Sequence, residues 1–249
     1  MVFKELKGVI SFLSVIPVFR VSSNIDINYI AHAMYLFPLV GAIIGFAVGA
    51  LAYMISFYFP TLVVGFIVVL MLVTITGVSH IDALADFADG VMARGGKEAK
   101  HRAMDDPAIG SAGTVALILY ISGMIIIISS FTTSAKLLAS IIASEVIAKY
   151  IMVLQAYLGQ SAWEGLSSPF TKAMKDKRRF VAATGITLPL ICFATGLTGV
   201  VSLCTSTIIA MLIQYSSNKN FGGISGDVLG ASNEISRLSS LIVIFSFNF

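Results

Sequence analysis

Three aspartates follow one another at spacings of four and three residues, directly behind a long apolar run. They are Asp82, Asp86 and Asp89, within the stretch HIDALADFADGVMARGG at residues 80–96. A helix advances by about 100° per residue, so these positions fall within an arc of about 60° on one helix face. Like charges this close repel unless a cation lies among them, and carboxylate oxygens suit Mg²⁺, Mn²⁺ or Ca²⁺. The spacing therefore predicts a divalent-metal site.

Small residues occur among and directly after these aspartates and would let a neighbouring helix or a phosphate group approach: Ala83, Ala85, Ala88 and Gly90. A solvated helix face would more often carry Lys, Glu or Gln at such positions. Two other interpretations stay open. One is a plain acidic helix end, and the other is a set of ion pairs with Arg94 and Lys97.

A second acidic element, MDDPAIGSAG at 104–113, stands before the next apolar run. Asp106 precedes Pro107, which disfavours a helical conformation for Asp106 and favours a turn or a helix start. Taken alone, Asp105 and Asp106 are most simply acidic residues that complement a helix N-terminus. Taken with the first cluster, Asp106 is a candidate fourth metal ligand.

A third element, NFGGISGDVLGASNE at 220–234, combines several glycines with Asp227 ahead of the last apolar run. Glycine-rich backbone beside a helix N-terminus can present N–H groups to phosphate, although such turns are also common connectors. Glu234 falls about two turns into the last helix. A charged residue costs roughly 2.5–3.5 kcal/mol at mid-membrane on insertion scales, so Glu234 is either functional or paired with Arg237.

Glu145 and Lys149 lie four residues apart inside another apolar run. That spacing places them on one helix face, where they can neutralise each other. A structural ion pair and a contact to substrate are both open for Lys149.

The elements that must position these residues are membrane helices. Of the 249 residues, 57% are hydrophobic and 12% are charged, far from the averages of soluble proteins. A net charge of +3, scattered along the chain, excludes a nucleic-acid surface. Cys192 and Cys204 lie in apolar runs without the spacing of a zinc or redox site.

Crossing the hydrocarbon core takes about 20 helical residues. The N-terminal stretch 1–20 is too short in its apolar part to span and shows no signal-peptide cleavage site, so we expect a retained interfacial helix. The prediction is an all-α polytopic integral membrane protein with one transmembrane catalytic domain over residues 1–249. Seven transmembrane helices are expected, at 33–57, 62–80, 111–131, 137–158, 180–197, 199–216 and 228–248.

The basic residues give the orientation, because cytoplasmic loops retain Lys and Arg. With the N-terminus inside, only Lys136 falls in an external loop, while Lys149 and Arg237 fall within spans. The acidic and glycine-rich elements then face the cytoplasm, so we expect a multi-pass cell-membrane protein with a cytoplasmic active site. The residues placed on the cytoplasmic side are Lys4, Lys7, Arg20, Arg94, Lys97, Lys100, Arg102, Lys172, Lys175, Lys177, Arg178, Arg179 and Lys219.

In combination, these elements resemble the cobalamin synthase (adenosylcobinamide-GDP ribazoletransferase) family over nearly the whole chain. Three stretches, in this order and between apolar runs, are the specific part of the resemblance: FPLVGAIIG, TGVSHIDALADFADG and GGISGDVLGASNE. In full, the matching stretches are SFLSVIPV at 11–18, FPLVGAIIG at 37–45, TGVSHIDALADFADG at 76–90, MDDPAIGSAG at 104–113, EGLSSPF at 164–170 and GGISGDVLGASNE at 222–234.

The resemblance implies that the enzyme joins adenosylcobinamide-GDP to α-ribazole, or to its 5′-phosphate. The products would be adenosylcobalamin, or its phosphate, and GMP, in the last assembly step of the nucleotide loop. It also implies a Mg²⁺ requirement, with Mn²⁺ as a substitute. The implied partners are these small molecules and membrane lipid, with no nucleic acid, and the oligomeric state stays open, a homo-oligomer included.

The functional residues implied by the resemblance come from three motifs. The catalytic residues are His80, Asp82, Asp86, Asp89 and Asp106, and all of these except His80 are also the expected metal ligands. The substrate-binding residues expected from the third motif are Gly222, Gly223, Gly226, Asp227 and Glu234. Arg94, Arg102 and Lys149, which lie outside these motifs, are also expected to bind substrate. Gly90, Gly110, Gly113 and Gly230 also match motif positions.

This chain departs from the family at three basic positions. Ala108 stands where the family usually carries a basic residue, and Asp105 stands where a basic residue is common, so Arg102 or Lys149 would supply that phosphate contact. Lys149 also stands near a usual arginine and lacks its bidentate fork.

Displacing GMP from a diphosphate moves negative charge onto the leaving phosphate, so catalysis should be mainly electrostatic and positional. We expect one or two cations across the diphosphate and attack by a ribose hydroxyl of the acceptor. His80 or a carboxylate would take the hydroxyl proton.

There are three alternatives: two are other membrane enzymes, and one, a transporter, comes from another class. A CDP-alcohol phosphotransferase-like enzyme would share the DGxxAR pattern, present here as Asp89 to Arg94, but its later GxxxDxxxD is missing. Prenyl-transferring membrane enzymes would need a second DxxxD far along the chain, which is also missing. An ion-coupled transporter would use intramembrane acids, yet most acids here cluster at one membrane face.

Overall fold

The computed structural model describes residues 2–16 and 26–247, and within them the chain is helical without any strand. This confirms the all-α prediction. Arg20 lies outside the described residues. In chain order the elements are α1 Val2–Leu13, α2 Ile27–His32, the 3₁₀ helix η1 Met34–Leu36, α3 Phe37–Ile55, α4 Thr61–Thr76, α5 Ser79–Met92, α6 Lys97–Met104, α7 Ser111–Ser130, α8 Ser134–Leu158, α9 Ser167–Met174, α10 Lys177–Thr195, α11 Leu197–Phe221 and α12 Gly226–Phe247.

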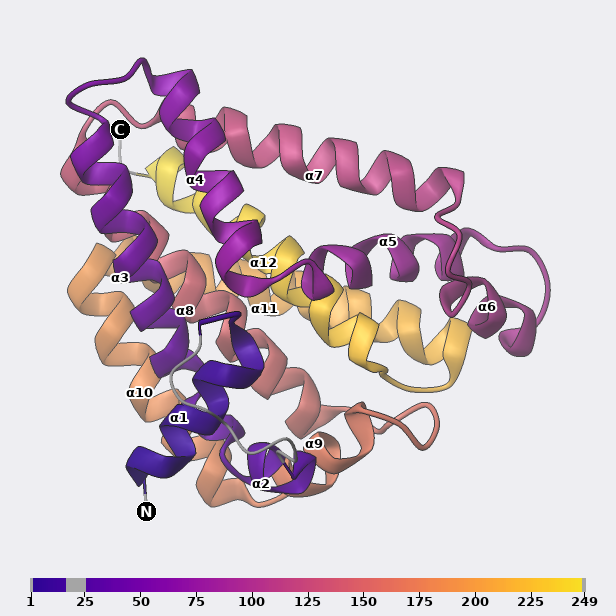
Figure 1. Cartoon of the computed structure of the whole chain (residues 1–249). Coiled ribbons are helices and arrows are strands. Elements are labelled where there is room, and N and C mark those ends of the chain that lie inside the picture. Colours follow the sequence, from indigo (N-terminus) through magenta and orange to yellow (C-terminus); the bar gives the residue numbers. More distant parts are fainter. Residues whose placement is uncertain (1, 17–25, 248–249) are drawn as a thin grey trace.

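Each of the seven predicted spans corresponds to one long helix, from α3 to α12 in Figure 1. Among the described residues, five helices are long and apolar enough to cross a membrane: Met34–Ile55, Ser111–Ser130, Ser134–Leu158, Leu197–Phe221 and Gly226–Phe247. The bent pair α4 and α5 raises this number to six if it forms one span. Helix α10 begins with the bases Lys177, Arg178 and Arg179 and is not among them. The polytopic architecture is confirmed, and a count of seven crossings is not.

The predicted span at 62–80 is wrong at its C-terminal end. Helix α4 ends at Thr76, and Gly77 follows with φ of 74°, a left-handed conformation that glycine adopts without strain. The chain then turns, and α5 runs at 93° to α4. The helix that carries the aspartates is therefore a separate element and does not continue the apolar run (Figure 1).

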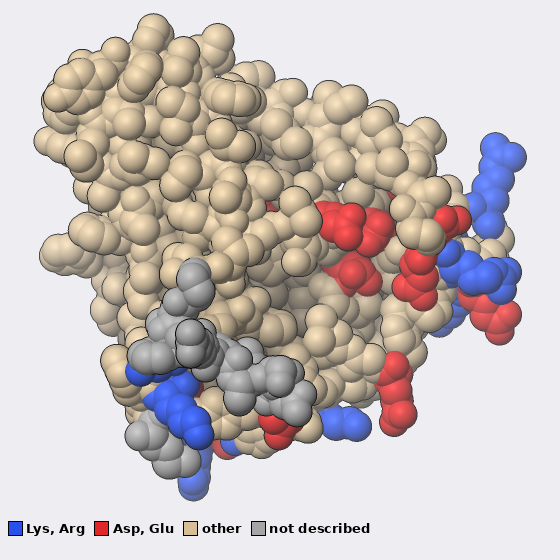
Figure 2. Space-filling view, in the orientation of Figure 1, with Lys and Arg blue, Asp and Glu red and all other residues tan. Residues whose placement is uncertain are grey.

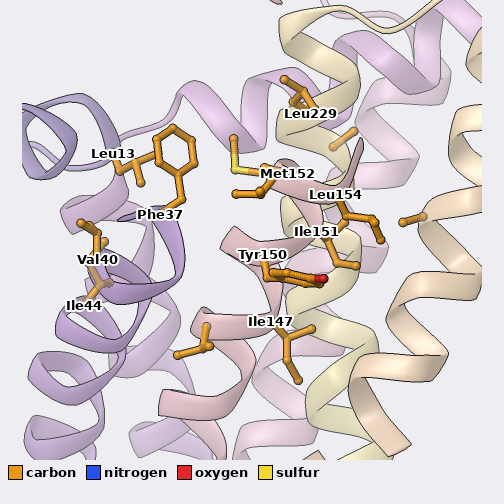
Figure 3. Close-up of a cluster of buried hydrophobic side chains, with 14 of the residues drawn as sticks. Leu13, Phe37, Val40, Ile44, Ile147, Tyr150, Ile151, Met152, Leu154 and Leu229 are labelled. Atoms are coloured by element: carbon orange, nitrogen blue, oxygen red, sulfur yellow. The ribbon is translucent and has the colours of Figure 1, made fainter. Parts of the chain in front are cut away.

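Helix α8 is the centre of the bundle, and 83% of the residues in its apolar stretch are buried. Helix α3 packs closely against it because glycines recur every four residues along the contact. A β-carbon at Gly41 would lie 2.5 Å from the Glu145 carbonyl oxygen, and one at Gly45 would lie 2.8 Å from the Ile142 α-carbon. Small residues at this spacing let membrane helices approach backbone to backbone. Figure 3 shows apolar side chains of α3 and α8 on either side of this contact.

On the face of the molecule that Figure 2 shows, the charged side chains avoid one end of the bundle. Figure 2 shows an uncharged upper left surface, where Figure 1 places the end of α3 and the start of α4, and it shows Lys, Arg, Asp and Glu at the right and at the bottom. Helix α1 lies near the charged lower end, where Tyr35 donates a hydrogen bond of 2.7 Å to Glu5. Its predicted position at the membrane interface stays a prediction.

Candidate active site

Five aspartates line one cavity of about 520 Å³, which we call the acidic pocket. They come from three places in the sequence: Asp82 and Asp86 from α5, Asp105 and Asp106 from the connection after α6, and Asp227 from the first turn of α12. No described lysine or arginine lines this pocket. Figure 2 shows acidic side chains gathered around a hollow in the region that α5 and α6 occupy in Figure 1. The structure thus brings together Asp82, Asp86, Asp106 and Asp227 in one cavity, and their functional roles stay predictions.

The carboxylates of the acidic pocket repel one another. Burial, followed by the charges of Asp82, Asp227, Asp89 and Asp105, raises the pKa of Asp86 to about 6. A nearby cation would stabilise a carboxylate whose pKa is raised in this way, because opposite charge favours its ionised form. The electrostatics of the pocket therefore suit a positively charged ligand.

The donor set of the acidic pocket suits a hard divalent cation that is shared with a substrate. In the described part of the chain, no three His, Cys, Asp or Glu side chains converge closely enough to enclose an ion by themselves. Mg²⁺ is usually bound by one or two carboxylates together with substrate phosphates and waters, and not by a complete protein cage. Pairs of carboxylates facing an open cavity fit that mode of binding.

Asp89 has a different environment from its two neighbours on α5. Its carboxylate accepts hydrogen bonds from the backbone N–H groups of Gly110, at 2.7 Å, and Gly113, at 2.9 Å. These groups belong to the N-terminus of α7, where backbone donors have no partner within the helix. Asp89 therefore caps α7 from another helix and does not line the acidic pocket. Its role as a metal ligand stays a prediction.

Replacing Asp89 by alanine should destabilise the protein by about 1–2 kcal/mol, the cost of losing an N-terminal helix cap. Asp89→Asn keeps one acceptor oxygen and should cost less. The measurement is the melting temperature in detergent, with Glu98→Ala on exposed α6 as the control. Unchanged stability of Asp89→Ala would show that the cap contributes nothing.

The glycine-rich stretch divides between a structural part and a part that faces a cavity. Gly222 ends α11 with φ of 90°, and the next residues form a parallel bridge in which Ile224 N–H donates to the Gln160 carbonyl at 2.8 Å. Gly223 is pressed against this loop, since a β-carbon there would lie 2.6 Å from Ala162 N. Gly226 and Gly230 instead line a second cavity. The predicted phosphate contacts of these glycines stay predictions.

The second cavity, of about 400 Å³, adjoins the acidic pocket, and we call it the apolar pocket. Asp82 and Asp227 line both cavities and mark the boundary between them. The remaining wall is mainly apolar and comes from α1, η1, α3, α5, α8, α9 and α12. Its large apolar side chains are Phe12, Met34, Phe37, Met152, Leu166, Phe170 and Leu229.

His80 lies in the wall of the apolar pocket, half a turn before Asp82. Its Nδ1 atom is buried and has no hydrogen-bond partner among the described residues. Burial, followed by the charges of Lys149 and Arg237, lowers the pKa of His80 well below its usual value. The ring is therefore neutral at physiological pH and offers one donor or acceptor to a ligand.

Lys149 and Glu234 lie in a buried ion network and not in the wall of either pocket. Both side chains are 0% exposed. Arg237 forms ion pairs with Glu234 and Glu145. Its Nη1 also donates a hydrogen bond of 3.0 Å to the hydroxyl oxygen of Tyr120. Lys149 donates to Asn233 at 2.8 Å and lies 3.8 Å from Glu145. The predicted pairs Glu145–Lys149 and Glu234–Arg237 are confirmed.

Arg94 and Arg102 are exposed and line neither pocket. Arg102 lies on α6, two residues before Met104, which is part of the acidic wall. Close by, the ring of His101 packs on Trp163 with ring centroids 3.7 Å apart and the planes tilted by 32°, and His101 pairs with Asp105 at 2.9 Å. This contact joins the 159–166 loop to the rim of the acidic pocket.

Comparison with known protein families identifies the family of this chain. The family described as cobalamin-5-phosphate synthase matches residues 5–245 of the chain. The chain belongs to this family. The match takes in every segment that lines the two pockets, and it removes the CDP-alcohol phosphotransferase and transporter alternatives.

Curated relatives in the cobalamin-5-phosphate synthase family are similar along nine tenths or more of their length. A protein of Archaeoglobus fulgidus is 32% identical over 96% of this chain and 96% of its own. Proteins of Methanococcoides burtonii and Halorubrum lacusprofundi are each 30% identical, over 96% and 97% of this chain and 90% and 96% of their own. All three are named adenosylcobinamide-GDP ribazoletransferase. No solved structure matches the chain.

Several pocket residues of this cobalamin-5-phosphate synthase family member were not among the predicted site residues. Asp105 is one, because its side chain was interpreted as part of a helix start. Phe12, Phe37 and Phe170 are others, and each reads as an ordinary core residue in sequence. The available signal was their position, since each lies in one of the stretches that carry the family resemblance.

Proposed function

We propose that the chain is an adenosylcobinamide-GDP ribazoletransferase that joins the adenosylcobinamide-phosphate group to α-ribazole or its 5′-phosphate. The observation that carries the proposal is the junction of an acidic and an apolar pocket at Asp82 and Asp227 in a member of this family. A reaction between a diphosphate and an aromatic nucleoside needs these two environments side by side.

In this proposal, Asp82 and Asp86 would hold Mg²⁺, or Mn²⁺, and Asp106 and Asp227 line the same pocket. A bound divalent cation neutralises charge that builds on the leaving phosphate oxygens. Five carboxylates without a described basic residue in the wall would otherwise repel a diphosphate, which supports a cation requirement.

The chemical step transfers one phosphorus between two oxygens. The acceptor hydroxyl oxygen forms a bond to the phosphorus on the cobinamide side, and the bond from that phosphorus to the GMP oxygen breaks. The hydroxyl proton passes to a carboxylate at the boundary of the pockets, Asp82 or Asp227, or to His80. Because all three line the apolar pocket, they are within the cavity that would hold the acceptor.

The proposal includes a membrane setting. Five helices suited to a membrane support an integral membrane enzyme with a single catalytic domain. Lys and Arg gather at the end of the bundle that holds the acidic pocket, which supports a cytoplasmic active site.

The test is to incubate membranes that contain the protein with adenosylcobinamide-GDP, α-ribazole and Mg²⁺. We expect GMP and adenosylcobalamin in equal amounts. Chelation by EDTA should abolish product, and added Mg²⁺ should restore it. Membranes from cells without the protein are the control. Absence of both products under these conditions would refute the proposed function, and turnover that survives EDTA would refute the metal requirement.

A further inference from the structure

Three phenylalanines from separate helices meet at one side of the apolar pocket. They are Phe12 of α1, Phe37 of α3 and Phe170 of α9. The ring centroids of Phe12 and Phe170 are 5.4 Å apart, those of Phe37 and Phe170 are 6.0 Å apart, and those of Phe12 and Phe37 are 6.1 Å apart. At these separations aromatic rings form tilted and edge-to-face contacts, and a further flat ring can pack against them.

Opposite these rings the wall is also apolar. Met152 of α8 and Leu229 of α12 line the same pocket (Figure 3). Methionine adapts to irregular shapes and makes favourable contacts with aromatic rings. The pocket thus offers an aromatic and thioether surface to a flat apolar ligand.

The size of the pocket restricts the ligand. A volume of about 400 Å³ is at the lower end of small-molecule sites. It suits a nucleoside and is too small for a corrin macrocycle with its amide side chains. Of the two substrates in the proposed function, α-ribazole is the one that fits, because it is a ribonucleoside of dimethylbenzimidazole.

The polar groups of the pocket also match a nucleoside of this kind. The base has one unsubstituted ring nitrogen, which accepts a hydrogen bond, and Nδ1 of His80, which has no partner among the described residues, can donate one. The ribose carries the hydroxyl that reacts, and Asp82 and Asp227 stand where the apolar pocket opens into the acidic pocket. A base against the phenylalanines would leave the ribose at this opening.

We propose that the apolar pocket is the acceptor subsite, in which Phe12, Phe37 and Phe170 bind the dimethylbenzimidazole ring and select for its methyl groups. This inference rests on the proposed function and adds the residues that determine acceptor specificity. Burial of one methyl group contributes about 0.8 kcal/mol, so two methyl groups favour α-ribazole over the unmethylated benzimidazole riboside by roughly tenfold.

The test compares Phe170→Leu with Phe131→Leu. Phe131 is also buried and packs on an aromatic ring, Phe245 at 5.2 Å, but it lies outside both pockets. Phe170→Leu should raise KM for α-ribazole about 3- to 10-fold, as expected for one lost aromatic contact. The KM for adenosylcobinamide-GDP should stay unchanged, and the preference for methylated over unmethylated acceptor should fall toward one. Phe131→Leu should change none of these.

A second measurement does not depend on turnover. Calorimetry with α-ribazole alone should show binding to the wild-type protein and to Phe131→Leu, and weaker binding to Phe170→Leu. Equal binding by the two variants, or no binding by the wild type, would overturn the acceptor subsite. A lipid that co-purifies with the wild type but not with Phe170→Leu, without a change in acceptor KM, would assign the pocket to lipid. Failure of the proposed function would differ, because wild type and Phe131→Leu would then form no product.

Discussion

Asp82→Asn and Asp86→Asn should each lower Mg²⁺-dependent turnover by about 10²–10³-fold, the usual effect of removing one electrostatic contact to a charged transition state. Both side chains come from one face of α5 and line the acidic pocket. Asparagine keeps the size and one oxygen but removes the charge that would hold a divalent cation. Product formation at saturating substrates is the measurement, and excess Mg²⁺ should recover part of the rate.

Glu98→Gln is the matched control, because it makes the same charge change on exposed α6, outside both pockets. It should retain turnover. If Asp82→Asn or Asp86→Asn kept the full Mg²⁺-dependent rate, the metal assignment would be wrong.

The melting temperature of Asp86→Asn shows whether a loss of turnover comes from a loss of fold. The folded pKa of Asp86, about 6, exceeds its ordinary value of 3.8. A raised carboxyl pKa contributes stability below the unfolded pKa, and this contribution is lost as pH rises through the folded pKa. Above pH 6 the ionised group therefore destabilises the metal-free protein. Asp86→Asn should melt at the same temperature as wild type or higher at pH 7.5, and this advantage should vanish at pH 4.

The spacing of the aspartates in sequence predicted their common helix face because α-helix geometry is regular. It could not predict the turn at Gly77, since a glycine between an apolar run and a helix is compatible with a continuous span. That turn sets α5 at 93° to α4, which decides where the aspartates point. Local periodicity gives the face of a helix, and packing gives its direction.

Asp89 shows the same limit at the level of one residue. By spacing it is equivalent to Asp82 and Asp86, yet its carboxylate binds the N-terminus of α7. Nothing in the local pattern distinguishes a carboxylate that faces a cavity from one that caps a distant helix. The apolar pocket was equally inaccessible to sequence reasoning, because its phenylalanines come from three helices whose contact is a tertiary property.

The sequence predicted the two ion pairs of the buried network but not the contact that connects them. Spacing of three and four residues placed Arg237 beside Glu234 and Lys149 beside Glu145. The structure joins the two pairs, because Arg237 on α12 also reaches Glu145 on α8. The network contains two acids and two bases, so its formal charge is zero, and it connects two helices that line the apolar pocket.

Arg237→Gln should be the most destabilising of the substitutions considered, because it leaves Glu145 and Glu234 with only Lys149 as a cationic partner. Breaking a buried ion pair by removing one partner costs about 3–5 kcal/mol, since the remaining charge is buried without compensation. We expect little folded protein in detergent extracts, measured as the monodisperse fraction on size-exclusion chromatography and as the melting temperature.

The charge-balanced double variant Arg237→Gln with Glu234→Gln tests whether net charge, and not the arginine itself, sets this cost. It retains the Glu145–Lys149 pair, separated by 3.8 Å in the wild-type structure, and it leaves no uncompensated charge. Neutral amides can also hydrogen-bond to Tyr120 and Asn233. Replacing a whole buried ion pair is often neutral for stability, so the double variant should recover most of the folded protein. If it were as unstable as Arg237→Gln alone, the guanidinium hydrogen bonds, and not charge balance, would hold α8 and α12 together.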